Sequence, residues 1–437
     1  YDMEGLLYEL DVNTLDVELL YKRALPGWHA KGGYTGQGRL VLANNGERGA
    51  RSVARFKPYD YQFDPARQSK EDAGALGDWD GQEWRLIERR QFTEVTSRGG
   101  IYGAPDDQAP IWAVGWDKRS LLLNVMEDGK WHRFRLPKAD YSYNGQHGWH
   151  TEWPRIREVV PADGDRPARF LANMHGGWFD FPPTFRAENT AGLKPIGSYL
   201  KISGDVAHFN GRITFGCDDA AKSHFLPGLG LHTDMDLVGQ SNSNLWFTTW
   251  DDLRGKGQPV GWGGWWMDDS VTGGQPSVPF LFGGYRQRVL HLSHGAGHDV
   301  TFSLETSDGR GEWRPLATIT VPAKGYKFEV FSADAPGQWI RATLDRDAPG
   351  VTAYFHYGPS KGASADQGLF ASLAEVDSPA AHGVAVLRGR GDNLGTLQVL
   401  ATSIDAKGNA SEPHLYEVGP DMKMISVDDP KQAEFIK

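Results

Sequence analysis

Two stretches of the chain repeat one pattern of strand, turn and strand, and this repeat constrains the fold more than any other feature. The first runs from Gly74 to Val95, where an Asp-Gly turn separates two tryptophans. The second runs from Ile111 to Leu136, ~40 residues downstream, which is within the range of a propeller blade repeat. It contains an arginine-bearing turn and another Asp-Gly turn. Asp-Gly between alternating apolar residues is a strong hairpin signal, so the repeat predicts antiparallel blades.

Composition extends this prediction to the rest of the chain. The 437 residues include 16 tryptophans, 54 glycines and 12% aromatic residues, and long apolar patterns of helical period are scarce. Four more segments have strand character at irregular spacing, namely 155–178, 199–217, 245–267 and 279–292. We therefore expect an all-β fold, a seven-bladed β-propeller, with residues 1–437 forming a single domain.

The two ends of the chain resemble each other. Residues 5–22 are predicted to form a strand, an Asp/Asn turn and a second strand, and residues 414–427 have the same form. Leu415–Val418 echoes Leu7–Leu10. We expect strands from both ends to complete one sheet and close the ring, which would leave no exposed sheet edge. Residues 300–357 alternate cleanly and taken alone could be a small sandwich, but no Pro/Ser-rich linker sets them apart, so we interpret them as one or two long-stranded blades.

Charge and motifs exclude several classes of function. The net charge of −10 argues against nucleic acid as a partner, and no run approaches the ~18 apolar residues that a membrane helix needs. The lone Cys217 excludes an intrachain disulfide. Serine-hydrolase, nucleotide-binding and zinc-protease motifs are absent, and adjacent acidic pairs lie in predicted turns. The chain begins at Tyr1 without an initiator methionine, as a mature or trimmed protein would, so we expect a secreted or periplasmic protein. Separately, we expect a monomer.

The richest local chemistry lies between Leu25 and Glu47. This stretch places His29, Lys31 and Gln37 among six glycines, beside a predicted strand. Glycine lets the backbone approach a ligand closely, so we take these three side chains as candidate site residues. Ordinary turn chemistry remains an alternative, because glycine-rich polar loops are common beside strands.

A second candidate region runs from Gln146 to Val159. It contains His150 close to two arginines, Arg155 and Arg157, at a predicted loop-to-strand entry. Imidazole can transfer protons near neutral pH. The alternative is that these polar groups only hydrogen-bond neighbouring blades.

Further candidates lie in later strands. Arg169 and His175 flank a predicted buried strand, and Arg286 follows a glycine pair, where a guanidinium could hold an anion. Residues 217–236 contain one cysteine with several aspartates and histidines, but their spacing matches no recognised metal site. We expect no required cofactor and leave a structural calcium ion open.

Five stretches together resemble a known enzyme family. They are GWHAKGGYTGQGR with ANNGE, QFTEVT with GGIYG, GWDKRS, HTEWPRIREV and PFLFGGYRQRV. The chain, from about Gly5 to Val427, resembles the seven-bladed β-propeller enzymes that remove terminal L-rhamnose from D-glucuronate in arabinogalactan side chains and gum arabic. Some members are L-rhamnose-α-1,4-D-glucuronate lyases, and a relative is an α-L-rhamnosidase.

The resemblance implies roles for particular residues. In the lyases an arginine neutralises the uronate carboxylate, a histidine or tyrosine removes the C5 proton, and a donor protonates the departing oxygen. The motifs carry the acid/base role to His29 and Tyr102, and anion binding to Arg119, Arg169 and Arg286. Together with these residues, the predicted substrate-binding set includes Lys31, Gln37, His150 and His175.

One stretch departs from the lyase pattern. The lyases use a second histidine shortly after the first, and here that region reads NNGERGARS. We expect an enzyme that releases terminal L-rhamnose from α-1,4-linked D-glucuronate by β-elimination. Hydrolysis of the same linkage and non-catalytic glycan binding remain open.

Overall fold

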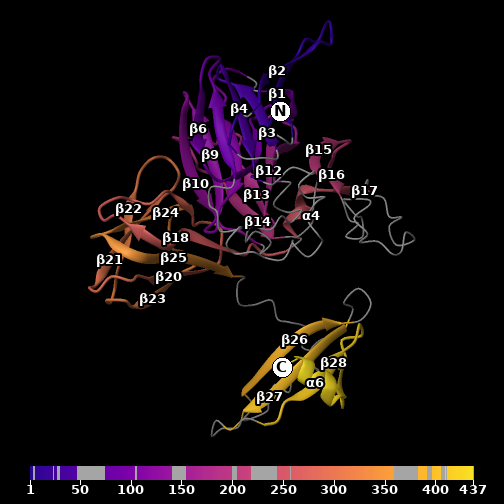
Figure 1. Cartoon of the computed structure of the whole chain (residues 1–437), viewed down its shortest axis with the longest axis vertical. Helices are drawn as coiled ribbons and strands as arrows, with labels where there is room; N and C mark the ends of the chain where they lie inside the picture. The colour runs from indigo at the N-terminus through magenta and orange to yellow at the C-terminus, as the bar shows by residue number, and fades with distance from the viewer. Residues whose placement is uncertain are drawn as a thin grey trace. The chain divides into compact units, whose positions relative to one another are not determined.

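The computed structural model describes most of the chain (Figure 1). The described residues are 1–2, 5–22, 24–26, 30–46, 74–103, 106–139, 154–198, 204–217, 244–255, 257–358, 382–390, 396–404, 409 and 411–436. Their regular secondary structure is almost entirely β-strand, which confirms the predicted all-β class. The chain divides into two compact units, Tyr1–Pro359 and Ser360–Lys437, whereas the sequence predicted one domain.

Consecutive antiparallel meanders make up the first part of unit 1 (Figure 1), and they are sheets of the kind that form propeller blades. The first contains β3 (Ala30–Gly36), β4 (Arg39–Asn44), β5 (Ala75–Trp79) and β6 (Trp84–Glu88). The second contains β7 (Gln91–Thr96), β8 (Ile111–Trp116), β9 (Leu121–Glu127) and β10 (Lys130–Leu136), with the 3-10 helix η2 (Gly100–Tyr102) after β7. The third contains β11 (Arg155–Val160), β12 (Arg169–Met174), β13 (Gly177–Phe181) and β14 (Lys194–Ser198). Three strands, β15 (Asp205–Phe209), β16 (Arg212–Cys217) and β17 (Asn244–Thr248), form the next sheet, before α4 (Trp250–Arg254). The predicted number of seven blades stays a prediction.

Hairpin turns in these meanders follow the sequence closely. Asp128 and Gly129 join β9 to β10 with φ of 51° and 70°, so both central residues lie in the left-handed region that a type I′ turn requires. The same geometry occurs at Gln37-Gly38, His175-Gly176 and Asn210-Gly211. The Asp-Gly signal therefore located a turn correctly, and the same backbone conformation explains the glycines after Gln37 and His175.

The strands after the meanders form a two-sheet sandwich instead of blades. One sheet has the order β18 (Gly261–Val271), β25 (Ala348–Gly358), β20 (Gln287–Ser293), β23 (Tyr326–Phe331). The other has β22 (Arg314–Val321), β21 (Val300–Ser307), β24 (Trp339–Leu344), β19 (Phe280–Leu281). Apart from the β21–β22 hairpin, neighbours in these sheets are not consecutive in sequence, and the strands of residues 300–357 are divided between the two sheets, so the blade interpretation of this segment is wrong. Alternation predicts a strand with one buried face, but it does not distinguish a blade from a sandwich.

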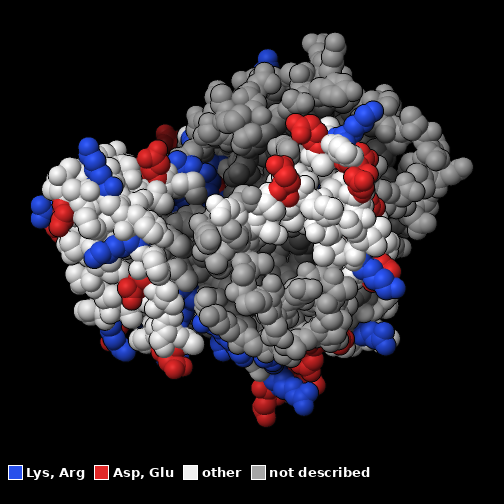
Figure 2. All heavy atoms as spheres, turned by 90° about the horizontal axis from the view of Figure 1, so that it is seen from below, with Lys and Arg blue, Asp and Glu red and all other residues white. Residues whose placement is uncertain are grey.

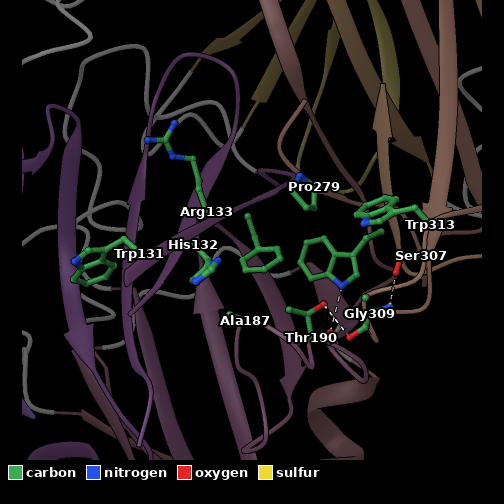
Figure 3. A pocket seen from close by; sticks show the side chains of 12 residues that line it. Trp131, His132, Arg133, Ala187, Thr190, Pro279, Ser307, Gly309 and Trp313 are labelled. Carbon is green, nitrogen blue, oxygen red and sulfur yellow. Dashed lines mark hydrogen bonds between the residues drawn. The ribbon is translucent and has the colours of Figure 1, made fainter. Parts of the chain in front are cut away.

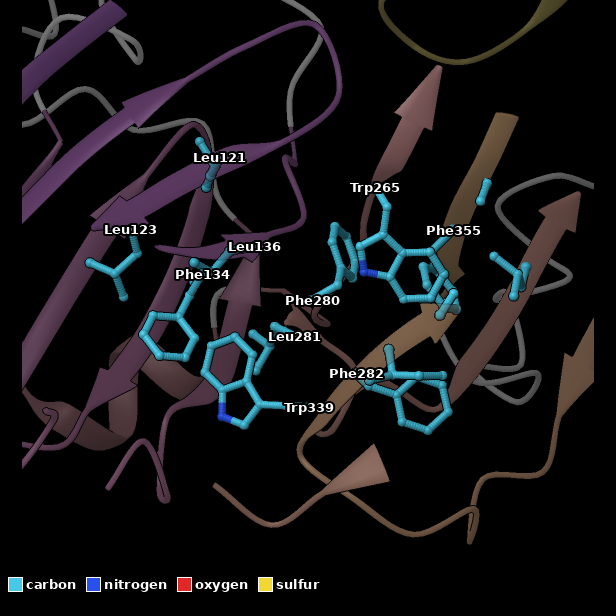
Figure 4. Packing of buried hydrophobic residues seen from close by; sticks show 14 of the residues in the cluster. Leu121, Leu123, Phe134, Leu136, Trp265, Phe280, Leu281, Phe282, Trp339 and Phe355 are labelled. Atoms are coloured by element: carbon cyan, nitrogen blue, oxygen red, sulfur yellow. The ribbon is translucent and has the colours of Figure 1, made fainter. Parts of the chain in front are cut away.

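The sandwich shares a core with the second meander. Strand β19 pairs in parallel with β10 through Arg135 and Phe280, which joins the two into one continuous sheet of eight strands. Figure 4 shows Phe280, Trp265 and Phe355 grouped together, and the ring of Phe280 stacks on Phe355 with centroids 5.3 Å apart. The meander and the sandwich are therefore built around common buried aromatic residues.

Strands from the two ends do not share a sheet among the described residues. Strand β1 (Leu7–Leu10) pairs with β2 (Val17–Tyr21) alone. Strands β26 (His382–Arg390), β27 (Thr396–Ile404), β28 (His414–Val418) and β29 (Met424–Val427) form a separate four-stranded sheet, followed by α6 (Pro430–Ile436). The predicted ring closure is wrong for these strands, because the repeated Leu-Tyr-Glu segment at 415–417 is already paired on both sides by β27 and β29.

The described surface carries mixed charge. In the space-filling view of Figure 2, basic and acidic side chains are interspersed over the face shown. Within the described residues no helix is long and apolar enough to cross a membrane.

Candidate functional site

The first strands of successive meanders lie next to one another. Strand β7 packs beside β3, and β15 packs beside β11. Salt bridges from Glu94 on β7 reach β11, so the first strands of the four sheets are connected in series. In a propeller these innermost strands surround the central axis, where a ligand can be approached from several blades at once. Polar side chains on them are therefore the first candidates for a site.

Glu94 lies at an irregularity in the pairing of strand β7. The pairing of β7 with β8 shifts register between Phe92 and Glu94, as in a β-bulge, which re-aims side chains locally. The Glu94 residue is buried and accepts hydrogen bonds from Nη1 of Arg155 at 3.2 Å and from Nη1 of Arg157. A buried carboxylate needs such charged donors to offset its lost hydration.

Arg155 and Arg157 lie two residues apart on β11, so their side chains leave the same face of the strand. Both also reach Asp205 at the start of β15. Nε of Arg157 lies 3.0 Å from Oδ1 of Asp205, and Nε of Arg155 lies 3.5 Å from Oδ2. The side chain of Asp205 is 47% exposed, whereas that of Glu94 is 8% exposed. We call these four residues the inner-strand cluster. One of its carboxylates is buried and the other opens to solvent.

Burial opposes the charge on Arg157, but the carboxylates of Glu94 and Asp205 outweigh it and raise the pKa of its guanidinium. Arg157 therefore stays cationic at any physiological pH. A cation that faces an exposed carboxylate can exchange that partner for an anionic ligand at little electrostatic cost.

Tyr34 on β3 borders this cluster. Burial raises the pKa of its hydroxyl, and nearby Ser97 and Arg157 lower it only in part. The hydroxyl therefore stays protonated near neutral pH. A protonated phenol in this position can donate a proton or a hydrogen bond to a ligand oxygen.

The structure separates the residues predicted to bind substrate. Gln37 is at a hairpin turn, where its amide donates to the carbonyl oxygens of Ala109 at 2.8 Å and Met126 at 3.1 Å. His175 is also at a turn, fully buried, with its ring 5.0 Å from that of Trp116. These contacts join neighbouring parts of the fold. They favour a structural role in a turn for Gln37, which was the alternative to ligand binding, and the same role for His175.

The three predicted anion-binding arginines lie apart. Nε of Arg119 donates to Asp269 at 2.8 Å, and Nη1 donates to Asp117 at 3.2 Å. The guanidinium of Arg169 lies 4.9 Å from the centre of the Trp250 ring. Arg286 is exposed before β20, whereas the next arginine on that strand, Arg288, is buried and donates to backbone carbonyls.

The remaining candidates are only partly within the described residues. Lys31 is half-buried on β3, the strand that packs beside β7. Tyr102 ends η2, which packs against β11, and nothing is described of its side chain. His29 and His150 lie outside the described residues.

A second group of charges surrounds Asp117 near the junction with the sandwich. Arg135 donates to both carboxylate oxygens of Asp117, at 2.9 and 2.8 Å, and Lys138 donates to its backbone oxygen. Burial disfavours the ionised form, but Arg135, Arg119 and Lys138 together hold the pKa of Asp117 far below its ordinary value. This junction cluster is a buried structural network.

Sequence reasoning missed the carboxylates of both clusters. Glu94 and Asp117 lie inside the quoted stretches QFTEVT and GWDKRS, but no role was assigned to them. Arg155 and Arg157 were noted only as members of a polar stretch. The available signal was a single acidic residue within a predicted strand, as for Glu94, or directly after an apolar one, as for Asp117, since an isolated buried carboxylate requires a cationic partner. In the part of the chain that the structure describes, no three His, Cys, Asp or Glu side chains gather as metal ligands would. The acidic segment after Cys217 lies outside it.

Comparison with known proteins leaves the family open. No protein-family model matches the chain, and a search of curated proteins finds no match. Among solved structures, an exo-β-1,3-galactanase from Phanerochaete chrysosporium aligns at 7% identity over 73% of this chain and 79% of its own, with a TM-score of 0.21. A β-fructofuranosidase from Bombyx mori aligns at 10% identity over 78% and 81%, with a TM-score of 0.21. The Tobacco streak virus coat protein aligns at 12% identity over 24% and 92%, with a TM-score of 0.17. Scores this low carry no argument about this chain.

Proposed function

We propose that the chain is a secreted or periplasmic carbohydrate-active enzyme that releases terminal L-rhamnose from α-1,4-linked D-glucuronate in arabinogalactan-type glycans, by β-elimination. The observation that supports this proposal is the position of the stretches that resemble the rhamnose-glucuronate enzymes. Three of them, which include β3, β7 with η2, and β11, lie far apart in sequence and meet in the fold. Their meeting point is the inner-strand cluster beside Tyr34.

The residue types at this point suit elimination from a uronate. The C5 proton of glucuronate is poorly acidic until the charge of the neighbouring carboxylate is offset. In the proposal, Arg155 and Arg157 take up that carboxylate on the side where Asp205 is exposed. Their existing bonds to Glu94 would hold the guanidinium groups in place as the ligand binds.

The proposed reaction moves one proton onto a base and another from an acid. His29, by resemblance to the lyases, removes the C5 proton, and the electron pair forms the C4=C5 double bond as the C4–O4 bond breaks. The departing rhamnose oxygen receives a proton from a tyrosine. Tyr34 suits this role because its hydroxyl stays protonated, and Tyr102 is the second candidate.

Hydrolysis of the same linkage is the alternative. The two reactions differ in product, since elimination leaves a 4,5-unsaturated uronate and hydrolysis leaves an intact one. Incubation with gum arabic, with ultraviolet absorbance and free rhamnose followed together, separates them. We expect both signals to rise in parallel. Rhamnose without absorbance would replace the lyase by a rhamnosidase, and saturable binding with neither signal would leave a non-catalytic glycan-binding protein.

A further inference from the structure

A cavity of about 420 Å³ lies where the second and third meanders meet the sandwich, away from the inner-strand cluster. Its volume is within the usual range for a small-ligand site. The lining comes from strand β10, the loop before β14, and the end of β21 with the following turn. Its residues are Trp131, His132, Arg133, Phe134, Ala187, Thr190, Pro279, Ser307, Gly309, Gly311, Trp313 and Trp339.

Strand alternation decides which lining side chains can meet a ligand. On β10, Trp131 and Arg133 face the first meander, where the indole donates to Asp78 at 2.8 Å and the guanidinium pairs with Glu88 at 2.8 Å. His132 and Phe134 therefore leave the opposite face. Figure 3 shows His132 beside the central rings, whereas Arg133 extends away from them. From β10 the cavity thus receives the imidazole of His132 and the ring of Phe134, while the guanidinium of Arg133 extends away from it.

The aromatic walls are held in place by their own contacts. Phe134 and Trp339 lie with ring centroids 5.1 Å apart, and both are buried. Trp313 is half-buried, and the guanidinium of Arg341 lies 4.3 Å from the centre of its ring. Arg341 is itself paired with Glu305 at 2.8 Å. One face of the Trp313 indole is therefore covered by a fixed cation, which orients the ring.

The turn after β21 closes the cavity against the third meander. The backbone N–H of Thr190 donates to the Gly309 carbonyl at 2.7 Å, and a Cβ at Gly309 would lie 2.6 Å from the backbone nitrogen of Ala191. The Trp339 indole donates to the Thr190 carbonyl at 3.3 Å. These contacts hold the loop before β14, the turn after β21 and Trp339 on β24 together around the cavity.

We propose that this cavity is a binding site for a neutral pyranose unit of a glycan. Sugar rings present apolar C–H faces that pack on aromatic rings, and hydroxyl groups that need hydrogen-bonding partners. Trp313 supplies an aromatic face that is partly accessible, and His132 is an exposed imidazole at the rim. Because Arg133 is turned away and paired, the site favours a neutral sugar over a uronate.

Titration calorimetry with β-1,3-galactobiose, which contains neither rhamnose nor glucuronate, tests the site. We expect saturable millimolar binding to the full chain. Trp313→Ala should weaken it at least about tenfold, as removal of a central aromatic anchor does, and His132→Ala should weaken it less. Tyr326→Ala is the matched control, because Tyr326 is a 56% exposed aromatic residue on the other sheet of the sandwich, and it should bind as the wild type does.

The proposal is overturned if galactobiose does not bind up to about 10 mM, if Trp313→Ala binds it as tightly as wild type, or if Trp313→Ala weakens glucuronate binding more than galactobiose binding. Loss of binding in Tyr326→Ala with none in Trp313→Ala would also overturn it and move the site to the outer sheet face. Binding is measured without turnover, so these outcomes do not depend on rhamnose release. A failure of the proposed function would appear only in the gum arabic assay.

Discussion

The two charge clusters of unit 1 use the same residue types in opposite ways. In the junction cluster, Asp117 has a fully buried side chain and is bonded by Arg135 and Arg119. In the inner-strand cluster, Arg155 and Arg157 share a buried Glu94 and an Asp205 that is 47% exposed. The two clusters differ in whether a ligand that enters from solvent can replace one of the carboxylates that pair with the arginines.

This difference separates a structural arginine from a ligand-binding one. Replacement of Asp117 by a substrate carboxylate would require opening of the core, because Arg119, Arg135 and Lys138 around it are also buried. Displacement of Asp205 only requires the movement of a half-exposed side chain. Arg119, which the sequence motif favoured for carboxylate binding, therefore belongs to the first kind, and Arg157 is the better candidate for the second. The following experiments test this division, from the largest expected effect to the smallest.

Asp117→Asn should destabilise unit 1 by about 3–5 kcal/mol, because it leaves the buried Arg135 and Lys138 without their counter-charge. Chemical unfolding followed by tryptophan fluorescence measures the change. Asp106→Asn is the control, since its 3.0 Å pair with Arg98 is exposed and should contribute at most about 1 kcal/mol. Equal effects of the two substitutions would remove the distinction between the clusters.

Arg157→Ala should lower kcat/KM for rhamnose release about 10²-fold, because a charge-assisted contact to the uronate is lost. Arg157→Lys should restore only part of the activity, since a lysine lacks the planar fork. Arg314→Ala, which removes an arginine with a 70% exposed side chain, is the control and should leave the rate unchanged.

The uronate methyl ester sharpens this test. Esterification should slow the wild type much more than Arg157→Ala, because the variant has already lost the carboxylate contact. An equal loss in both enzymes would return Arg169 or Arg286 to the carboxylate-binding role.

The stability that Asp117 contributes should depend on pH only under acidic conditions. Its folded pKa is depressed by Arg135, Arg119 and Lys138 despite burial, so the contribution is fully present above the ordinary aspartate pKa of about 3.9. Below that pH it should fall by up to about 1.4 kcal/mol per pH unit toward the folded pKa. Unfolding free energies of wild type and Asp117→Asn, measured from pH 7 to pH 3, should therefore run parallel and then converge below about pH 4. Curves that stay parallel throughout would contradict the assignment.

Tyr34→Phe should reduce kcat about tenfold with a change in unfolding free energy below about 1 kcal/mol, because the ring still fills its site while the proton donor is lost. The rate and the stability of the variant are measured side by side. Unchanged turnover would assign the donor role to Tyr102.

The sequence by itself determined the all-β class and several local features. Alternating apolar residues define strands with one buried face, and Asp128-Gly129 defined a hairpin turn because glycine and aspartate tolerate positive φ. Gln37 and His175, which the sequence suggested as site residues, lie at turns of the same kind, and a polar residue before glycine looks alike in a turn and in a binding loop.

Only the tertiary structure decided which strands share a sheet and which charges meet. Period-two alternation is the same in a blade and in a sandwich, so it did not reveal that β18 pairs with β25. The bond between Arg157 and Glu94 joins residues 63 positions apart, and no local pattern encodes such a pair. A side chain's partner depends on how whole sheets pack, whereas its turn or strand conformation depends mainly on the few residues beside it.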